Sequence, residues 1–241
     1  MPYFHTMNLN EATISLLGDS AILINFENKI DETVNSKVLH LFYKLKEKSL
    51  PFVKDIVPAY SSLVIFYDLL IMNNKNTVNK ISLKIFTDQI KKLIAEDIKI
   101  SSLTSGKIKI PVCYSEKYAL DLQHLSKQKG LAPDEIVRLH TTKKYRVYMI
   151  GFLPGFAYMG EVDKKIAMPR KAQPRTNVEA GSVGIAGMQT GIYPLDSPGG
   201  WQIIGKTPIK LFNKENVDPV LLQPGDEIEF YSITEDEFTN Y

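Results

Sequence analysis

The sequence predicts an α+β chain of two domains, a ferredoxin-like α/β sandwich followed by a compact β-barrel or β-sandwich. Strand-like and helix-like patterns alternate in the first part of the chain. Ten of the fourteen glycines and five of the thirteen prolines then fall between Gly151 and Gly205. Helices and long regular strands do not tolerate that density, whereas short strands joined by tight turns do. The serine- and threonine-rich stretch at 97–108 indicates an exposed connection, so we expect domains at 1–98 and 107–241.

The first domain shows the order strand, helix, strand, strand, helix, which is the skeleton of a ferredoxin-like sandwich. Ile22, Ile24 and Phe26 alternate with Leu23 and Asn25, which predicts a strand. An apolar stripe at helical spacing follows from Asp31, the expected N-cap. Two β-rich runs, Phe52–Val57 and Ser61–Tyr67, precede a second amphipathic segment at Thr77–Glu96.

The second domain is expected to open with a strand at Lys107–Tyr114. Two short helices follow at Lys117–Lys129 and Pro133–His140, the second with proline in its first turn and acidic residues beside the positive end of the dipole. The final strand is expected at Glu227–Ser232, after a Pro-Gly-Asp turn.

Composition excludes several classes of protein. With 29 basic and 27 acidic residues the net charge is +2, which indicates neither a nucleic-acid nor a membrane partner. The N-terminus lacks a signal-peptide pattern and no apolar run is long enough to span a bilayer, so we expect a cytoplasmic protein. The single Cys113 permits no internal disulfide, and the four scattered histidines indicate no metal site.

Three glycine-rich segments concentrate the candidate functional residues. They are Gly151–Gly160, Met168–Arg175 and Gly181–Trp201, in which arginines and amides are interleaved with aromatic residues. Loops held by a rigid barrel are common places for binding sites. Taken singly, these residues are better explained structurally: the glycines by turns, the aromatic residues by a core, and the arginines by surface ion pairs.

Chemistry assigns provisional roles to these residues. Arg170 or Arg175 can bind a carboxylate or phosphate through two parallel hydrogen bonds. Gln189 or Thr190 can form a hydrogen bond with an amide or carbonyl group. His140 is the one candidate acid or base, with a structural role at a helix end as the alternative. The candidate catalytic residues are His140, Arg170, Arg175 and Gln189, and the candidate substrate-binding residues are Pro154, Phe156, Tyr158, Thr190, Tyr193 and Trp201. No Walker A, dinucleotide-binding or nucleophile-elbow motif is present.

The same segments resemble a known family. Its signature is similar to Gly151-Phe-Leu-Pro-Gly-Phe-Ala-Tyr158, Met168-Pro-Arg170, Pro174-Arg175, Gln189-Thr-Gly-Ile-Tyr-Pro194 and Ser197-Pro-Gly-Gly-Trp201. This is the family of KipI and of the first component of allophanate hydrolase, also called the carboxyltransferase C/D domain. The likeness covers nearly the whole chain, with one departure at Glu179, where the family usually carries a proline.

The resemblance implies a cyclophilin-like C-terminal barrel and the role of a 5-oxoprolinase B subunit. Such a protein works with the A and C subunits to open 5-oxo-L-proline to L-glutamate, with ATP as co-substrate of the assembled complex, and is expected to be inactive alone. No other cofactor is implied. Two alternatives stay open: a KipI-type inhibitor that binds a histidine kinase, and a component of a urea carboxylase.

Overall fold

The computed structural model describes residues 7–9, 12–27, 29–72, 82–95 and 106–241. The chain forms two compact units, Met1–Thr104 and Ser105–Tyr241. The predicted joint at 97–108 lies largely outside the described residues, so the domain limits of 98 and 107 stay predictions.

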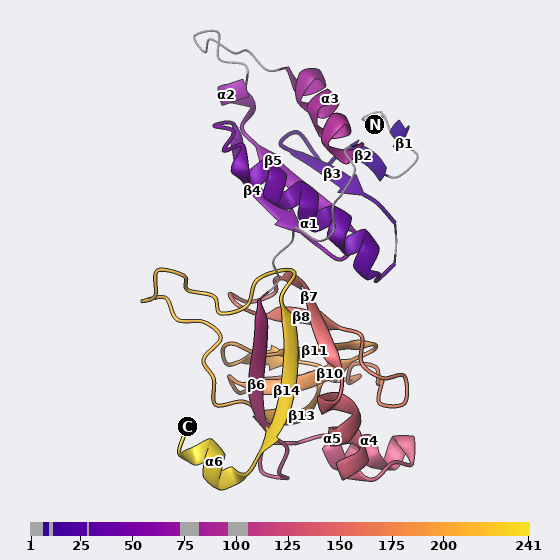
Figure 1. Cartoon of the computed structure of the whole chain (residues 1–241), viewed down its shortest axis with the longest axis vertical. Helices are drawn as coiled ribbons and strands as arrows, with labels where there is room; N and C mark the ends of the chain where they lie inside the picture. Colours follow the sequence, from indigo (N-terminus) through magenta and orange to yellow (C-terminus); the bar gives the residue numbers. More distant parts are fainter. Residues whose placement is uncertain (1–6, 10–11, 28, 73–81, 96–105) are drawn as a thin grey trace. The chain divides into compact units, whose positions relative to one another are not determined.

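The N-terminal unit is an antiparallel sheet with helices packed against it (Figure 1). The strand order is β1-β2-β3-β5-β4. Its elements are β1 (Met7–Leu9), β2 (Ala12–Leu16), β3 (Ala21–Asn25), α1 (Glu32–Glu47), β4 (Val53–Pro58), β5 (Ser62–Tyr67), α2 (Leu69–Met72) and α3 (Leu83–Ile94).

Local signals set the helix boundaries in this unit. The Asp31 carboxylate accepts hydrogen bonds from the backbone N–H groups of Thr33 and Val34, at 2.9 and 3.0 Å, which confirms the predicted N-cap. Helix α3 begins after Ser82, whose side chain caps Ile85 N–H. The part of the predicted second helix before residue 82 lies outside the described residues.

The ferredoxin-like arrangement stays a prediction. The elements β3, α1, β4, β5 and α3 follow one another as expected. The place beside β3, however, is taken by β2, which precedes it in the chain and was not predicted as a strand. In the ferredoxin-like motif a strand after the second helix would close the sheet.

The C-terminal unit contains the predicted β-barrel. Seven of its described strands close in the order β10-β11-β8-β7-β14-β6-β13, and β12 and β9 form a separate two-stranded sheet. The elements are β6 (Lys107–Cys113), α4 (Leu122–Lys129), α5 (Pro133–Thr141), β7 (Lys144–Ile150), β8 (Ala157–Gly160), β9 (Arg175–Val178), β10 (Ser182–Ala186), β11 (Gln189–Ile192), β12 (Ser197–Gly199), β13 (Gln202–Lys206), β14 (Glu227–Ile233) and α6 (Glu235–Thr239). The cyclophilin-like assignment of this barrel stays a prediction.

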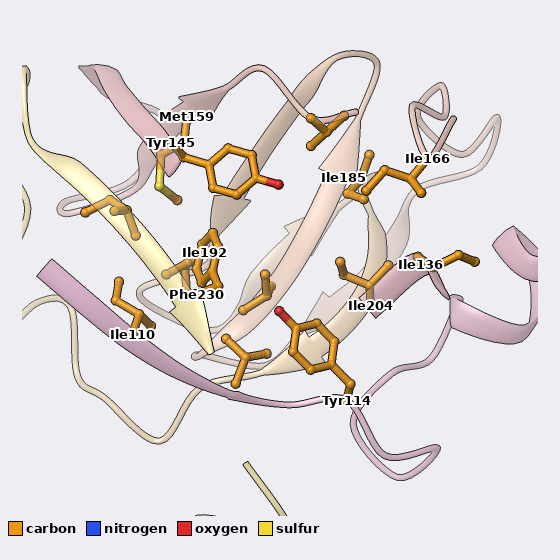
Figure 2. Packing of buried hydrophobic residues seen from close by; sticks show 14 of the residues in the cluster. Ile110, Tyr114, Ile136, Tyr145, Met159, Ile166, Ile185, Ile192, Ile204 and Phe230 are labelled. Carbon is orange, nitrogen blue, oxygen red and sulfur yellow. The ribbon is translucent and has the colours of Figure 1, made fainter. Parts of the chain in front are cut away.

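The barrel depends on one pairing between distant segments. Strands β6 and β14 run parallel along their whole length, from Lys107 beside Glu227 to Cys113 beside Ile233 (Figure 1). Apolar side chains fill the interior, with Ile110 and Phe230 among them (Figure 2). This arrangement holds the loops between the strands in fixed positions.

Helix α4 begins later than the sequence predicted. The expected helix started at Lys117, but the chain first forms a turn in which Tyr118 and Ala119 N–H donate to the Ser115 carbonyl. The backbone of Asp121 then bonds β13 instead of continuing a helix, since its N–H donates to the Ile203 carbonyl at 2.7 Å.

No helix in the described ranges is long and apolar enough to cross a membrane.

Among the glycines within the barrel strands, Gly205 in β13 has the closest neighbours, which predicts a stability defect on substitution. A Cβ at this position would lie 2.7 Å from Val112 Cγ1 and 2.9 Å from the Cys113 carbonyl oxygen. Gly205→Ala is therefore expected to lower the free energy of unfolding by about 1–3 kcal/mol, measured by denaturant unfolding. The control is Gly151→Ala, where the added Cβ meets only the flexible end of Met149, at 3.3 Å. Equal unfolding midpoints for the two variants would contradict the prediction.

Candidate functional site

One pocket collects most of the aromatic residues that the sequence singled out. It has a volume of about 230 Å³. The lining residues are Phe152, Phe156, Tyr158, Arg170, Pro174, Tyr193, Pro198, Gly199, Gly200 and Trp201. Five of the candidate residues therefore lie together here, brought from three segments of the chain: Phe156, Tyr158, Arg170, Tyr193 and Trp201.

The pocket wall is built from aromatic rings at strand ends. Phe156 directly precedes β8, Tyr193 directly follows β11 and Trp201 directly precedes β13. The Phe156 ring packs edge to face against Tyr193 and Trp201, with centroids 5.3 and 5.4 Å apart. These three rings are buried, so the wall is rigid and apolar.

Gly199 allows the wall to close around Tyr193. A Cβ on Gly199 would lie 2.7 Å from Tyr193 Cζ, so only glycine permits this approach. The phenolic oxygen of Tyr193 is a hydrogen-bond partner of the Trp201 backbone, and burial raises the pKa of the phenol. The hydroxyl therefore keeps its proton at neutral pH and can donate it to a ligand oxygen.

Arg170 supplies positive charge at the mouth of this pocket. Its guanidinium carbon lies 5.9 Å from the centre of the Trp201 ring. The side chain is exposed, and within the described part of the chain it forms no ion pair. Its fork is thus available to bind an anion.

Arg175 is placed differently from Arg170. Its Nη2 donates to Asp121 Oδ1 at 2.6 Å, and Lys171 Nζ donates to the same oxygen at 2.9 Å. The Ile203 N–H donates to Asp121 Oδ2 at 2.7 Å. Asp121 therefore belongs to the site, although sequence reasoning did not select it. Its place directly before a helix resembles an ordinary N-cap, yet its side chain makes no capping bond.

The Asp121 carboxylate is buried but ionised. Burial by itself would raise its pKa, but hydrogen bonds from Arg175, Lys171 and the Ile203 backbone outweigh that effect, and the pKa lies below its ordinary value. Lys171 and Arg175 bind this carboxylate, and Arg170 adds a third positive charge beside Trp201, so the site holds three cations and one carboxylate. The surroundings of the pocket therefore favour a ligand that carries negative charge.

His140 and Thr190 lie elsewhere, inside the barrel. His140 Nε2 contacts Thr190 Oγ1 at 2.9 Å and Nδ1 contacts the Tyr114 hydroxyl at 2.8 Å. His140 and Thr190 are completely buried, and burial lowers the pKa of the imidazole to about 3. An acid or base needs access to a reacting group. The geometry thus favours the structural alternative for His140, while its predicted catalytic role has not been tested.

The last two candidates lie outside the pocket lining. Gln189 opens β11 and pairs with Gly160 of β8, with its side chain partly exposed. Pro154 is exposed in the turn before β8. Their roles in binding stay predictions.

The fold and site together define a β-barrel domain with a small aromatic pocket that an exposed arginine helps to line. A family model described as the carboxyltransferase domain, subdomain C and D, matches residues 12–222. The chain belongs to this family, which confirms the resemblance seen in its motifs.

Named relatives cover nearly the whole chain. The 5-oxoprolinase B subunit of Bacillus subtilis (strain 168) is 40% identical over 232 residues, 95% of each chain. The 5-oxoprolinase B subunit of Escherichia coli O157:H7 is 34% identical, covering 92% of this chain and 96% of that one. The crystal structure of TTHA0988 superposes with a TM-score of 0.76 at 33% identity. The match covers 88% of this chain but only 40% of the TTHA0988 chain.

Proposed function

We propose that this chain is the B subunit of a 5-oxoprolinase. In this proposal it acts with the A and C subunits to open 5-oxo-L-proline to L-glutamate, with ATP as co-substrate of the assembled complex. The supporting observation is the 40% identity to the B. subtilis protein over 95% of both chains. The likeness therefore spans nearly the whole of that relative.

The chemistry of the pocket suits this substrate. 5-Oxoproline is a small five-membered lactam that carries one carboxylate. The buried faces of Phe156 and Trp201 match the ring, and the Arg170 fork matches the carboxylate. In this proposal the Tyr193 hydroxyl, which lines the pocket and keeps its proton, donates to the lactam oxygen. Thr190, predicted for that contact, already bonds His140 and the Gly184 carbonyl.

We place the lactam in this pocket and ATP elsewhere in the complex. A volume of about 230 Å³ lies below the range of about 300–1,000 Å³ that is typical of larger ligands. A nucleotide would then bind partly or wholly on another protein of the complex. Because the reaction needs ATP, we also propose a cytoplasmic location.

The test is 5-oxoproline-dependent ATP hydrolysis, with glutamate followed in parallel. The chain alone is compared with the complex co-purified with the A and C subunits. Activity only in the complex supports the proposal. An assembled but silent complex contradicts it, and the next measurement would then be inhibition of histidine-kinase autophosphorylation.

A further inference from the structure

Asp121 joins segments of the chain that are far apart in the sequence. Its carboxylate binds Lys171 and Arg175 in the loop that carries Arg170, and it binds β13 through Ile203. Only 3% of its side chain is exposed. Removing a carboxylate from water is costly unless strong partners replace the solvent, and here two cations and one backbone N–H do so.

These contacts act on the pocket without entering it. The Lys171 N–H donates to the Gly200 carbonyl at 2.7 Å, and Gly200 lines the pocket. Asp121 itself is absent from the lining. The loop from Arg170 to Arg175 is thus held against the start of β13, next to Trp201, by the buried carboxylate together with the Lys171–Gly200 backbone bond.

The pairing also divides the cations into two kinds. Arg175 and Lys171 are committed to Asp121, whereas Arg170 extends over the Trp201 ring. The neighbouring arginines that looked equivalent in the sequence therefore have different tasks. Without the carboxylate, Lys171 and Arg175 would repel each other and the loop would lose its anchor.

We propose that Asp121 is a positioning residue, which fixes the loop of residues 170–175 so that Arg170 meets the carboxylate of the substrate. This inference rests on the proposed function, because it names the device that prepares the same pocket. Asp121 contacts no substrate atom. Its effect passes through Arg170, so its loss weakens binding of 5-oxoproline more than it slows the chemical step.

The first test is Asp121→Asn in the assembled complex. Asparagine keeps an oxygen for the Ile203 N–H but loses the charge that holds the two cations. We expect KM for 5-oxoproline to rise about tenfold while kcat changes less than about threefold. Asp121→Glu, which restores the charge, should give a KM closer to wild type. A purely structural residue would instead reduce the amount of active complex and leave KM unchanged.

A double-mutant cycle with Arg170→Ala decides whether Asp121 acts through that arginine. If it does, Asp121→Asn should lower kcat/KM by no more than about twofold when Arg170 is already alanine. Full additivity of the two losses would overturn the proposal. Glu135→Gln, which breaks the exposed pair with Arg138 on α5, is the matched control and should leave KM unchanged.

The outcomes separate this inference from the proposed function. A wild-type complex without 5-oxoproline-dependent activity overturns both. An active wild-type complex with an unchanged KM in Asp121→Asn overturns only the positioning role. If Asp121→Asn does not fold, Lys171→Met takes its place in the cycle, since it removes one anchor and leaves the Arg175 pair.

Discussion

Arg170→Ala is expected to reduce kcat/KM for 5-oxoproline by about 10- to 100-fold in the assembled complex, because it removes a charge-assisted bond to the substrate. The guanidinium lies over Trp201 and is exposed. Little of the barrel depends on it, so the free energy of unfolding should change by less than about 1 kcal/mol. The measurement pairs steady-state kinetics with denaturant unfolding of the same preparation.

Two further variants sharpen this result. Arg170→Lys keeps the charge but loses the planar fork, so its activity should lie between those of wild type and Arg170→Ala. Arg138→Ala removes an exposed arginine that pairs with Glu135, away from the pocket, and should retain wild-type kinetics. A wild-type kcat/KM in a folded Arg170→Ala complex would show that Arg170 does not bind the substrate.

Local signals in the sequence predicted the parts of the fold that depend on local physics. Asp31 predicted the start of α1 because its carboxylate meets N–H groups two and three residues away. The density of glycines predicted short strands. At Gly205 the glycine is also required by packing, since a Cβ there would lie 2.7 Å from Val112 Cγ1. The barrel itself closes through β6 and β14, more than a hundred residues apart, and no local pattern encodes that pairing.

The same contrast between local signals and long-range contacts applies to the candidate site. The glycine-rich segments singled out these aromatic residues, and the structure places Phe156, Tyr193 and Trp201 in one pocket, while their role in binding stays a prediction. The sequence could not separate Arg170 from Arg175, because the difference is made by Asp121, fifty-four residues before Arg175. An aspartate directly before a helix is usually explained as an N-cap. Only the tertiary structure shows that Asp121 instead binds Lys171, Arg175 and the backbone of β13.

His140 shows a further limit of sequence reasoning, because its burial and its hydrogen-bond partners determine which ring nitrogen carries the proton. Thr190 Oγ1 donates its proton to the Gly184 carbonyl, at 3.1 Å, so it accepts from His140 Nε2–H. Burial lowers the pKa of the imidazole and so keeps the ring neutral, which leaves Nδ1 to accept from the Tyr114 hydroxyl. Both ring nitrogens are then satisfied, and the ring stacks on Phe230 at 4.7 Å. Figure 2 shows Tyr114, Tyr145 and Phe230, three ring neighbours of this histidine.

This neutral histidine predicts a pH-dependent stability. Burial lowers its pKa from 6.5 to about 3, so the unfolded chain takes up a proton over a range where the folded chain does not. The free energy of unfolding should consequently fall as the pH drops from about 6.5 toward 3, and this contribution is constant above 6.5. At about 1.4 kcal/mol per pH unit, moving from neutral pH to about pH 5 should cost about 2 kcal/mol. The neighbouring phenols of Tyr114 and Tyr145 do not titrate in this range, because burial raises their pKa values.

His140→Gln should therefore do two separable things. At neutral pH it should lower the free energy of unfolding by about 1–3 kcal/mol, since one glutamine cannot satisfy Tyr114 and Thr190 together as the ring does. Between about pH 6.5 and 5 it should also flatten the pH dependence, because the group that the unfolded chain protonates is gone. Denaturant unfolding at several pH values measures both effects, with His124→Gln on the exposed face of α4 as the matched control. An unchanged slope in His140→Gln would show that the ring is not held neutral in the barrel, and would reopen its assignment as an acid or base.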